Sequence, residues 1–94
     1  MTKLDIVFTN RMKKDVKLLK KQGKDLNKLI SVLDTLSKRE KLPDKNKDHA
    51  LKGEYSGFRE CHIEPDWLLI YKIEEKELVL YATATGSHAD LFGM

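Results

Sequence analysis

The chain has 94 residues, of which 40% are hydrophobic and 35% charged, a balance typical of one folded domain rather than of a disordered chain. We therefore expect a single domain over residues 1–94. No apolar run approaches the roughly 20 residues that a membrane helix needs, and the first residues lack the apolar stretch of a signal peptide. The single cysteine, Cys61, has no partner for an internal disulfide, which fits a cytoplasmic protein.

The charge is unevenly distributed along the chain. Residues 1–52 carry 15 Lys and Arg against 7 Asp and Glu, whereas residues 53–94 carry 3 against 8. A basic half of this kind is typical of proteins that contact nucleic acid or an acidic partner. The alternative is that the lysines only keep helix surfaces in contact with water, and charge alone does not separate the two.

The first half of the chain predicts one strand followed by two helices. Residues 4–8 combine β-branched and aromatic side chains, as a short strand does. Thr9 or Asn10 is expected to cap a first helix, and Gly23 is expected to end it. A second helix ends before Pro43, and its apolar stripe is formed by Leu26, Leu29, Ile30, Leu33 and Leu36.

The second half predicts a loop followed by three strands. Residues 40–57 are polar and interrupted by proline and glycine, so we expect a long loop there. The strand-like segments are residues 58–63, 67–73 and 78–83, and their short connections favour antiparallel pairing. The middle segment is apolar at nearly every position, as a strand buried on both faces is. The sequence thus predicts an α+β fold of order β-α-α-β-β-β, with a twisted antiparallel sheet and both helices packed on one side.

The candidate chemistry also lies in the second half. His49, His62 and His88 fall in loops or at strand ends, and Asp66 accompanies them. Their spacing matches no common zinc-ligand pattern, so we expect no metal and no cofactor. Histidine near neutral pH can act as an acid or a base, which are the two proton-transfer roles that RNA cleavage requires. An aromatic side chain can stack an unpaired base, and a cation can hold the phosphate.

Three collinear segments resemble the signature stretches of YafQ-type toxins, a branch of the RelE/ParE superfamily. They are D-H-A-L-K-G at 48–53, F-R-E-C-H-I-E-P-D-W-L-L-I-Y at 58–71 and T-G-S-H-A-D-L-F at 85–92. The resemblance implies a RelE-like fold and the toxin of a type II toxin–antitoxin pair. Such toxins cleave mRNA in the decoding site of the translating ribosome by metal-independent attack of the 2′-hydroxyl. The partners it implies are a cognate antitoxin, the ribosome, mRNA, and operator DNA bound through the antitoxin.

The resemblance also implies roles for individual residues. His88 corresponds to the general acid, and His49 and His62 correspond to residues that orient the RNA or act as the base. Asp66 would hold a histidine or contact the nucleotide. Trp67 and Phe92 would shape a base pocket, although a tryptophan in an apolar strand is also typical of a core anchor. The basic surface that would contact ribosomal RNA includes Lys13, Lys14, Lys17, Lys20 and Lys21.

One position departs from the family pattern. Where these toxins carry an arginine two residues before the glycine of the last signature stretch, here Gly86, this chain has Ala84. The missing guanidinium would stabilise phosphate charge in the transition state. Three explanations are open: a replacement that makes the toxin tolerable to an expression host, a natural variant in which Arg59 or Lys52 takes over, or a naturally inactive toxin.

Two other functions compete with RNA cleavage. A ParE-like toxin shares the fold but poisons DNA gyrase, and it needs no set of acid–base histidines. A regulator that binds nucleic acid without catalysis would need only the basic helices. The histidines favour the endoribonuclease.

Overall fold

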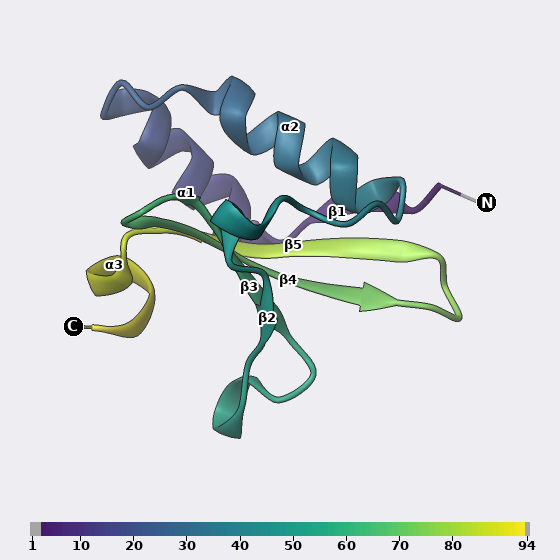
Figure 1. Cartoon of the computed structure of the whole chain (residues 1–94). Helices are drawn as coiled ribbons and strands as arrows, with labels where there is room; N and C mark the ends of the chain where they lie inside the picture. The colour runs from purple at the N-terminus through teal and green to yellow at the C-terminus, as the bar shows by residue number, and fades with distance from the viewer. Residues whose placement is uncertain (1–2, 94) are drawn as a thin grey trace.

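The computed structural model describes residues 3–93. Within this range a five-stranded sheet carries helices on one face and a loop and a short helix at the other (Figure 1). No helix in this range is long and apolar enough to cross a membrane. In chain order the elements are β1 (Asp5–Phe8), α1 (Asn10–Lys21), α2 (Leu26–Ser37), the 3-10 helix η1 (Asp44–Asn46), β2 (His49–Ala50), the 3-10 helix η2 (Gly53–Tyr55), β3 (Arg59–Glu64), β4 (Trp67–Glu74), β5 (Val79–Gly86) and α3 (His88–Phe92).

The sheet confirms the α+β class and the order of the main elements. Its strand order is β1-β5-β4-β3-β2, and β3, β4 and β5 pair antiparallel as predicted. The short strand β2, which the sequence does not predict, also pairs antiparallel with β3. The first strand differs, because β1 runs parallel to β5 with Asp5 opposite Val79. The sheet is therefore mixed rather than wholly antiparallel. Element order alone does not fix which strand is the neighbour of β1. Here α1 and α2 follow β1 directly, and its sheet neighbour is the last strand, β5.

Both N-terminal helices begin at side-chain caps. The Thr9 hydroxyl accepts a hydrogen bond from the backbone N–H of Met12, and it donates one to the carbonyl oxygen of Thr83. This one side chain thus starts α1 and ties it to β5. Asp25 caps α2 in the same way by accepting from the N–H of Asn27. The predicted stripe of α2 is wrong at Ile30, which is 60% exposed, because the buried face of the helix passes instead through Val32.

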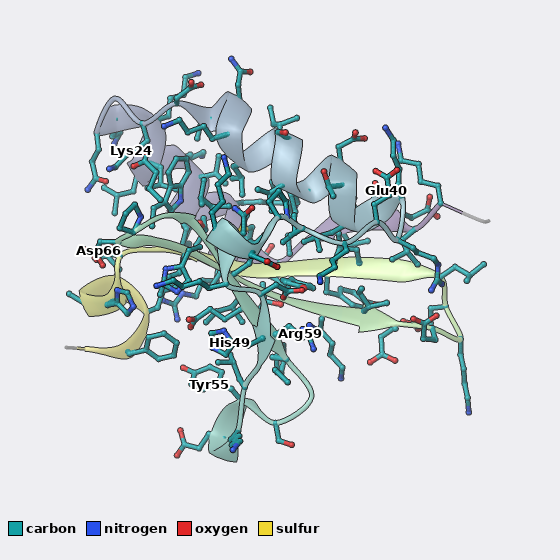
Figure 2. The ribbon with its side chains drawn as sticks, in the orientation of Figure 1. Lys24, Glu40, His49, Tyr55, Arg59 and Asp66 are labelled. Atoms are coloured by element: carbon teal, nitrogen blue, oxygen red, sulfur yellow. The ribbon has the colours of Figure 1, made fainter. Side chains whose placement is uncertain are left out.

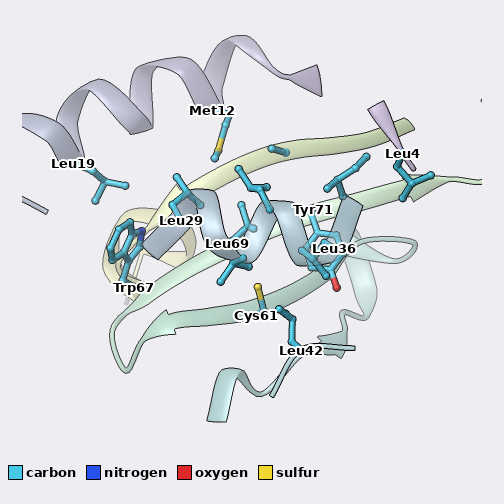
Figure 3. Packing of buried hydrophobic residues seen from close by; sticks show 14 residues of the cluster. Leu4, Met12, Leu19, Leu29, Leu36, Leu42, Cys61, Trp67, Leu69 and Tyr71 are labelled. Carbon is cyan, nitrogen blue, oxygen red and sulfur yellow. The ribbon is translucent and has the colours of Figure 1, made fainter. Parts of the chain in front are cut away.

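The main core lies between the two helices and one face of the sheet (Figure 3). Trp67 and Tyr71 contribute the largest side chains from β4, and Met12 and Leu29 cover them from the helices. Cys61 is fully buried in this core, and burial raises the pKa of its thiol to about 12. The cysteine therefore stays protonated and acts as a small apolar side chain.

A second, smaller cluster covers the opposite face of the sheet. Its buried members are Leu68 and Ile70 from β4, Ala84 from β5 and Leu91 from α3. The side chains packed against them come from the η2 region and from α3, namely Leu51, Tyr55, Phe58 and Phe92. Strand β4 is consequently buried on both faces, as its apolar sequence predicts.

Two segments are more ordered than the sequence predicts. The expected loop over residues 40–57 contains both 3-10 helices and the short strand β2. The helix α3 is not predicted at all, yet it has clear end signals. Ser87 and Asp90 form a reciprocal capping box at its start, and Gly93 ends it with a positive φ of 71°. These local bonds fix the residues that follow β5.

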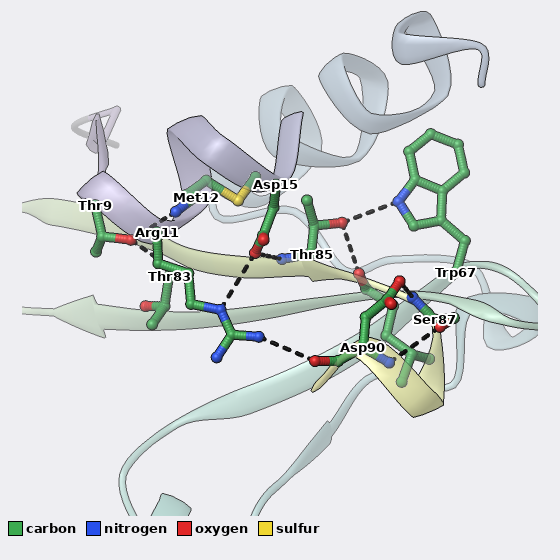
Figure 4. A network of polar contacts seen from close by, with 10 residues as sticks. Thr9, Arg11, Met12, Asp15, Trp67, Thr83, Thr85, Ser87 and Asp90 are labelled. Atoms are coloured by element: carbon green, nitrogen blue, oxygen red, sulfur yellow. Dashed lines mark hydrogen bonds and ion pairs between the residues drawn. The ribbon is translucent and has the colours of Figure 1, made fainter. Parts of the chain in front are cut away.

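A buried polar network joins α1 to the middle of the sheet (Figure 4). The indole N–H of Trp67 donates to the Thr85 hydroxyl at 2.9 Å, and that hydroxyl donates to the carbonyl oxygen of Leu68 at 2.7 Å. The backbone N–H of Thr85 donates to Asp15 at 3.1 Å. Thr85 is 1% exposed, so this network satisfies polar groups that water does not reach.

We predict that replacing Thr85 with valine destabilises the protein. The substitution keeps the shape of the side chain but leaves the buried indole N–H of Trp67 without an acceptor, at a cost of about 1–3 kcal/mol in the free energy of unfolding. Urea denaturation followed by tryptophan fluorescence measures it. The matched control is Thr83→Val, whose hydroxyl is only partly buried. An equal loss in both variants would show that the network does not contribute.

Candidate active site

The three histidines lie together beside the second cluster. His49 comes from β2, His62 from β3, and His88 is the first residue of α3. The ring centroids of His62 and His88 are 5.8 Å apart. Asp66 lies in the turn between β3 and β4, next to α3 (Figure 2). The structure thus brings together the four residues for which the sequence predicts acid–base chemistry.

Asp66 and His88 form a close pair. Ring atom Nδ1 and the backbone N–H of His88 both donate to Oδ1 of Asp66, at 2.7 and 3.0 Å. The backbone N–H and the ring together hold the pKa of the Asp66 carboxyl below its usual range. Asp66 is therefore ionised at neutral pH, and its carboxylate accepts the Nδ1 hydrogen of His88. This arrangement suits His88 for the donation of a proton.

The other two histidines have their Nδ1 atoms bonded to backbone oxygens. His49 Nδ1 lies 2.7 Å from the carbonyl oxygen of Lys47, and His62 Nδ1 lies 3.3 Å from that of Pro65. A carbonyl oxygen only accepts, so each Nδ1 carries the hydrogen. In residues 3–93 no hydrogen bond uses the Nε2 atom of any of the three rings. No hydrogen bond within these residues therefore occupies Nε2 on any of the three rings.

The sequence prediction missed Glu60. Its carboxylate lies between two of the histidines, with Oε1 at 3.6 Å from His49 Nε2 and 3.8 Å from His62 Nε2. A signal for it exists in the sequence. Glu60 stands two residues before His62 on a strand, and side chains two apart share a face of the sheet. The register adds His49, which pairs directly with Glu60 across β2 and β3.

The two aromatic residues predicted for a base pocket have different surroundings. Phe92 is partly exposed and meets Tyr55 edge-on, with ring centroids 5.7 Å apart. Trp67 is 1% exposed and belongs to the main core on the helix side. The structure gives Trp67 the surroundings of a core anchor, and Tyr55 is the aromatic side chain that accompanies Phe92.

The cations proposed to replace a guanidinium at position 84 are not equivalent. Arg59 is partly buried, and its Nε donates to Asp48 and to the Tyr71 hydroxyl, both at 3.3 Å. Lys52 is exposed and immediately precedes η2. Ala84 is 3% exposed and lies opposite Ile70 in the second cluster, on the face of the sheet that α3 covers.

The basic residues predicted for ribosome contact lie on the outer surface of α1. All of them are exposed, and none takes part in an ion pair with another residue of the described range 3–93. They are Lys13, Lys14, Lys17, Lys20 and Lys21. Their charges are thus available to a polyanion.

Known proteins of the same length and fold are close relatives. The mRNA interferase toxin YafQ of Escherichia coli K12 is 45% identical over 94 residues, which cover 99% of this chain and 100% of the relative. In the crystal structure of the E. coli DinJ–YafQ toxin–antitoxin complex, one chain is 44% identical with a TM-score of 0.88, covering 97% of this chain and 99% of that one. A metal-bound toxin from Helicobacter pylori is 44% identical with a TM-score of 0.90, covering 95% of this chain and 99% of that one.

The metal in the Helicobacter structure raises the question whether this site could hold one. Among residues 3–93, no group of three or more His, Cys, Asp or Glu side chains has an arrangement that could hold a metal ion. We assign no step to a metal.

The family model of the bacterial toxin YafQ of type II toxin–antitoxin systems matches residues 4–93, nearly the whole chain. The match includes every histidine of the site and the sheet that positions them. The chain belongs to the YafQ toxin family.

Proposed function

We propose that this chain is a ribosome-dependent endoribonuclease that cleaves translated mRNA by attack of the 2′-hydroxyl. The observation that carries the proposal is the arrangement of three histidines, each with Nδ1 bonded to an acceptor and with Nε2 outside any hydrogen bond in residues 3–93. Acid–base cleavage of RNA needs such rings on either side of a phosphate. The E. coli relative named as an mRNA interferase supports the same reading.

In this mechanism His49 is the base and His88 the acid. Nε2 of His49 takes the proton from the 2′-hydroxyl, and the resulting oxygen attacks phosphorus. The bond from phosphorus to the 5′-oxygen breaks, and Nε2 of His88 donates its proton to that oxygen. The products are a 2′,3′-cyclic phosphate and a 5′-hydroxyl. Asp66 holds the ring of His88 through Nδ1 at 2.7 Å and stabilises its charged form.

The surroundings of the histidines suit a single-stranded RNA. A groove next to His62 is lined by Lys45, Lys47 and Pro65, so two cations lie where neighbouring phosphates would pass. Phe92 and Tyr55 offer an aromatic edge for an unstacked base. The lysines of α1 would contact ribosomal RNA.

Ala84 is expected to attenuate the enzyme rather than to abolish catalysis. The acid, the base and the carboxylate of Asp66 do not depend on position 84, so proton transfer remains possible. What is lost is a guanidinium that would hold charge on the phosphate.

The partner of this chain follows from its family. We infer that a cognate antitoxin neutralises it, because the E. coli relative occurs in a complex with DinJ. In that assembly the antitoxin would bind operator DNA. An enzyme that acts on translating ribosomes works in the cytoplasm.

We predict that His88→Ala lowers the rate of cleavage by about 10²–10⁴-fold, the usual contribution of a general acid. The experiment adds the protein to translating ribosomes and maps the RNA ends. The fold should survive, because the side chain is exposed. Cuts within codons support the endoribonuclease, whereas unchanged RNA together with inhibited gyrase supercoiling would establish the gyrase poison instead. Unchanged RNA with intact gyrase activity would leave the non-catalytic regulator.

We predict that Ala84→Arg raises the cleavage rate and deepens growth arrest, on the order of tenfold to a hundredfold, because a guanidinium on this face supplies phosphate charge stabilisation. Ala84→Met is the control for side-chain size, since it fills the same space without a charge. No gain with arginine, or an equal gain with methionine, would show that the missing cation does not limit the enzyme.

We predict that replacing the five exposed lysines of α1 with glutamine weakens ribosome binding and reduces its dependence on salt. Each lysine that contacts a phosphate releases a counterion, and this release makes binding fall steeply as salt rises. Sedimentation with ribosomes over a series of salt concentrations measures both effects. Lys41 and Lys76, exposed elsewhere, serve as control positions. Unchanged association of the α1 variant would contradict this role.

A further inference from the structure

Glu60 is a nearly buried carboxylate without an ordinary cationic partner. Its side chain is 8% exposed, and no ion pair joins it to a lysine or arginine of the described residues 3–93. The neighbouring groups that can carry a positive charge are the rings of His49 and His62. Their Nε2 atoms both approach the same oxygen, Oε1, at 3.6 and 3.8 Å. An ionised carboxylate in such a place needs a positive partner.

The hydrogen bonds of the two rings determine where that positive charge can arise. Both Nδ1 atoms already carry hydrogens, because each one donates to a carbonyl oxygen. If both rings were neutral, each Nε2 would therefore direct a lone pair toward the carboxylate oxygen. A proton on one Nε2 replaces this repulsion with attraction and turns that ring into a cation.

We propose that Glu60 keeps one proton on His62, so that the His62 imidazolium is the cation that holds the scissile phosphate where the family arginine is absent. Glu60 is then a positioning residue, since it acts through His62 and does not touch the RNA. This inference rests on the proposed function. It also assigns different charges to the two histidines on either side of Glu60.

His62 is better placed than His49 to hold the charge. The His62 side chain is 17% exposed and that of His49 is 51% exposed. Attraction to a carboxylate is stronger where less water screens it. Burial also disfavours a charged imidazole, so a charge on the more enclosed ring depends on Glu60. His49 then remains neutral, and its Nε2 keeps the lone pair that a base requires.

The proposal also accounts for two carboxylates in a site with three histidines. His62 and His88 are adjacent, with centroids 5.8 Å apart, and two cations at this distance repel each other. Each ring has its own carboxylate, Glu60 for His62 and Asp66 for His88. Both rings can therefore be charged at once, one to bind phosphate and one to donate a proton.

Some of the other charged groups near His62 favour protonation of its ring, and others oppose it. On β4 the residue opposite His62 is apolar Leu68, so the strand adds no charge. The lysines along the groove oppose protonation of the ring, but they are exposed and screened. The titratable or charged residues that the contacts and the groove place around the ring are His49, Glu60, Glu64, Asp66, His88, Lys45 and Lys47.

Nitrogen NMR of the imidazole rings in the full chain at pH 7 tests the proposal directly. We expect both ring nitrogens of His62 to be protonated, and Nε2 of His49 to be unprotonated. In Glu60→Gln, His62 should become neutral. Glu64→Gln is the matched control, because Glu64 lies on the same strand but binds Lys24 and Lys28. A neutral His62 in the unmodified chain overturns the proposal, whether or not the Glu60 variant folds.

A double-mutant cycle tests the role of the charge in cleavage. Glu60→Gln should lower the single-turnover rate on the order of a hundredfold, and Glu60→Asp should recover part of it. In the Ala84→Arg background the same Glu60→Gln change should lower the single-turnover rate much less, because the guanidinium then supplies the cation. Equal losses in both backgrounds would show that the guanidinium at position 84 does not replace the His62 cation, and would overturn this role of Glu60. Absence of cleavage by the unmodified chain and by Ala84→Arg would instead overturn the proposed function, while the NMR result is independent of it.

Discussion

Burial of strand β4 on both faces is the constraint from which the rest of the structure follows. One face carries Trp67, Leu69 and Tyr71, and two amphipathic helices are needed to cover them. The other face carries Leu68 and Ile70, and residues 3–93 contain no further long helix to cover those. The η2 region and α3 do so instead. The candidate site thus lies beside the second cluster. The segments that cover this cluster include α3, which also carries the site residue His88.

The histidines gain defined roles from bonds on their non-reacting sides. A backbone oxygen orients His49, and a carboxylate orients His88, so rings of the same type have different surroundings, as the proposed base and acid require. η1 contributes to this orientation as well, because the Asn46 side chain donates to the carbonyl oxygen of His62 at 2.7 Å. A segment for which the sequence predicts a polar loop therefore helps to position a residue of the candidate site.

The sequence predicts most of the fold, because helix caps and buried strands depend on local patterns. Thr9 and the apolar run of β4 are examples, and the structure confirms both. The parallel partner of β1 was not predictable in this way, since a strand's neighbour depends on the whole chain. Of the site, the resemblance supplied the histidines but not Glu60, whose importance depends on which residues β2 places opposite β3. Local patterns likewise could not tell which cluster receives Trp67.

The pairing of β1 with β5 has a consequence for the order of events during synthesis. Residues 5–8 are made early, yet their partners, residues 79–82, follow 74 residues later. His88 follows later still, in a helix whose cap begins only after β5 ends. A nascent chain can form α1 and α2 but cannot complete the sheet or the site. Until residues 79–92 have been made, the chain therefore lacks both the partner of β1 and the His88 ring that Asp66 holds.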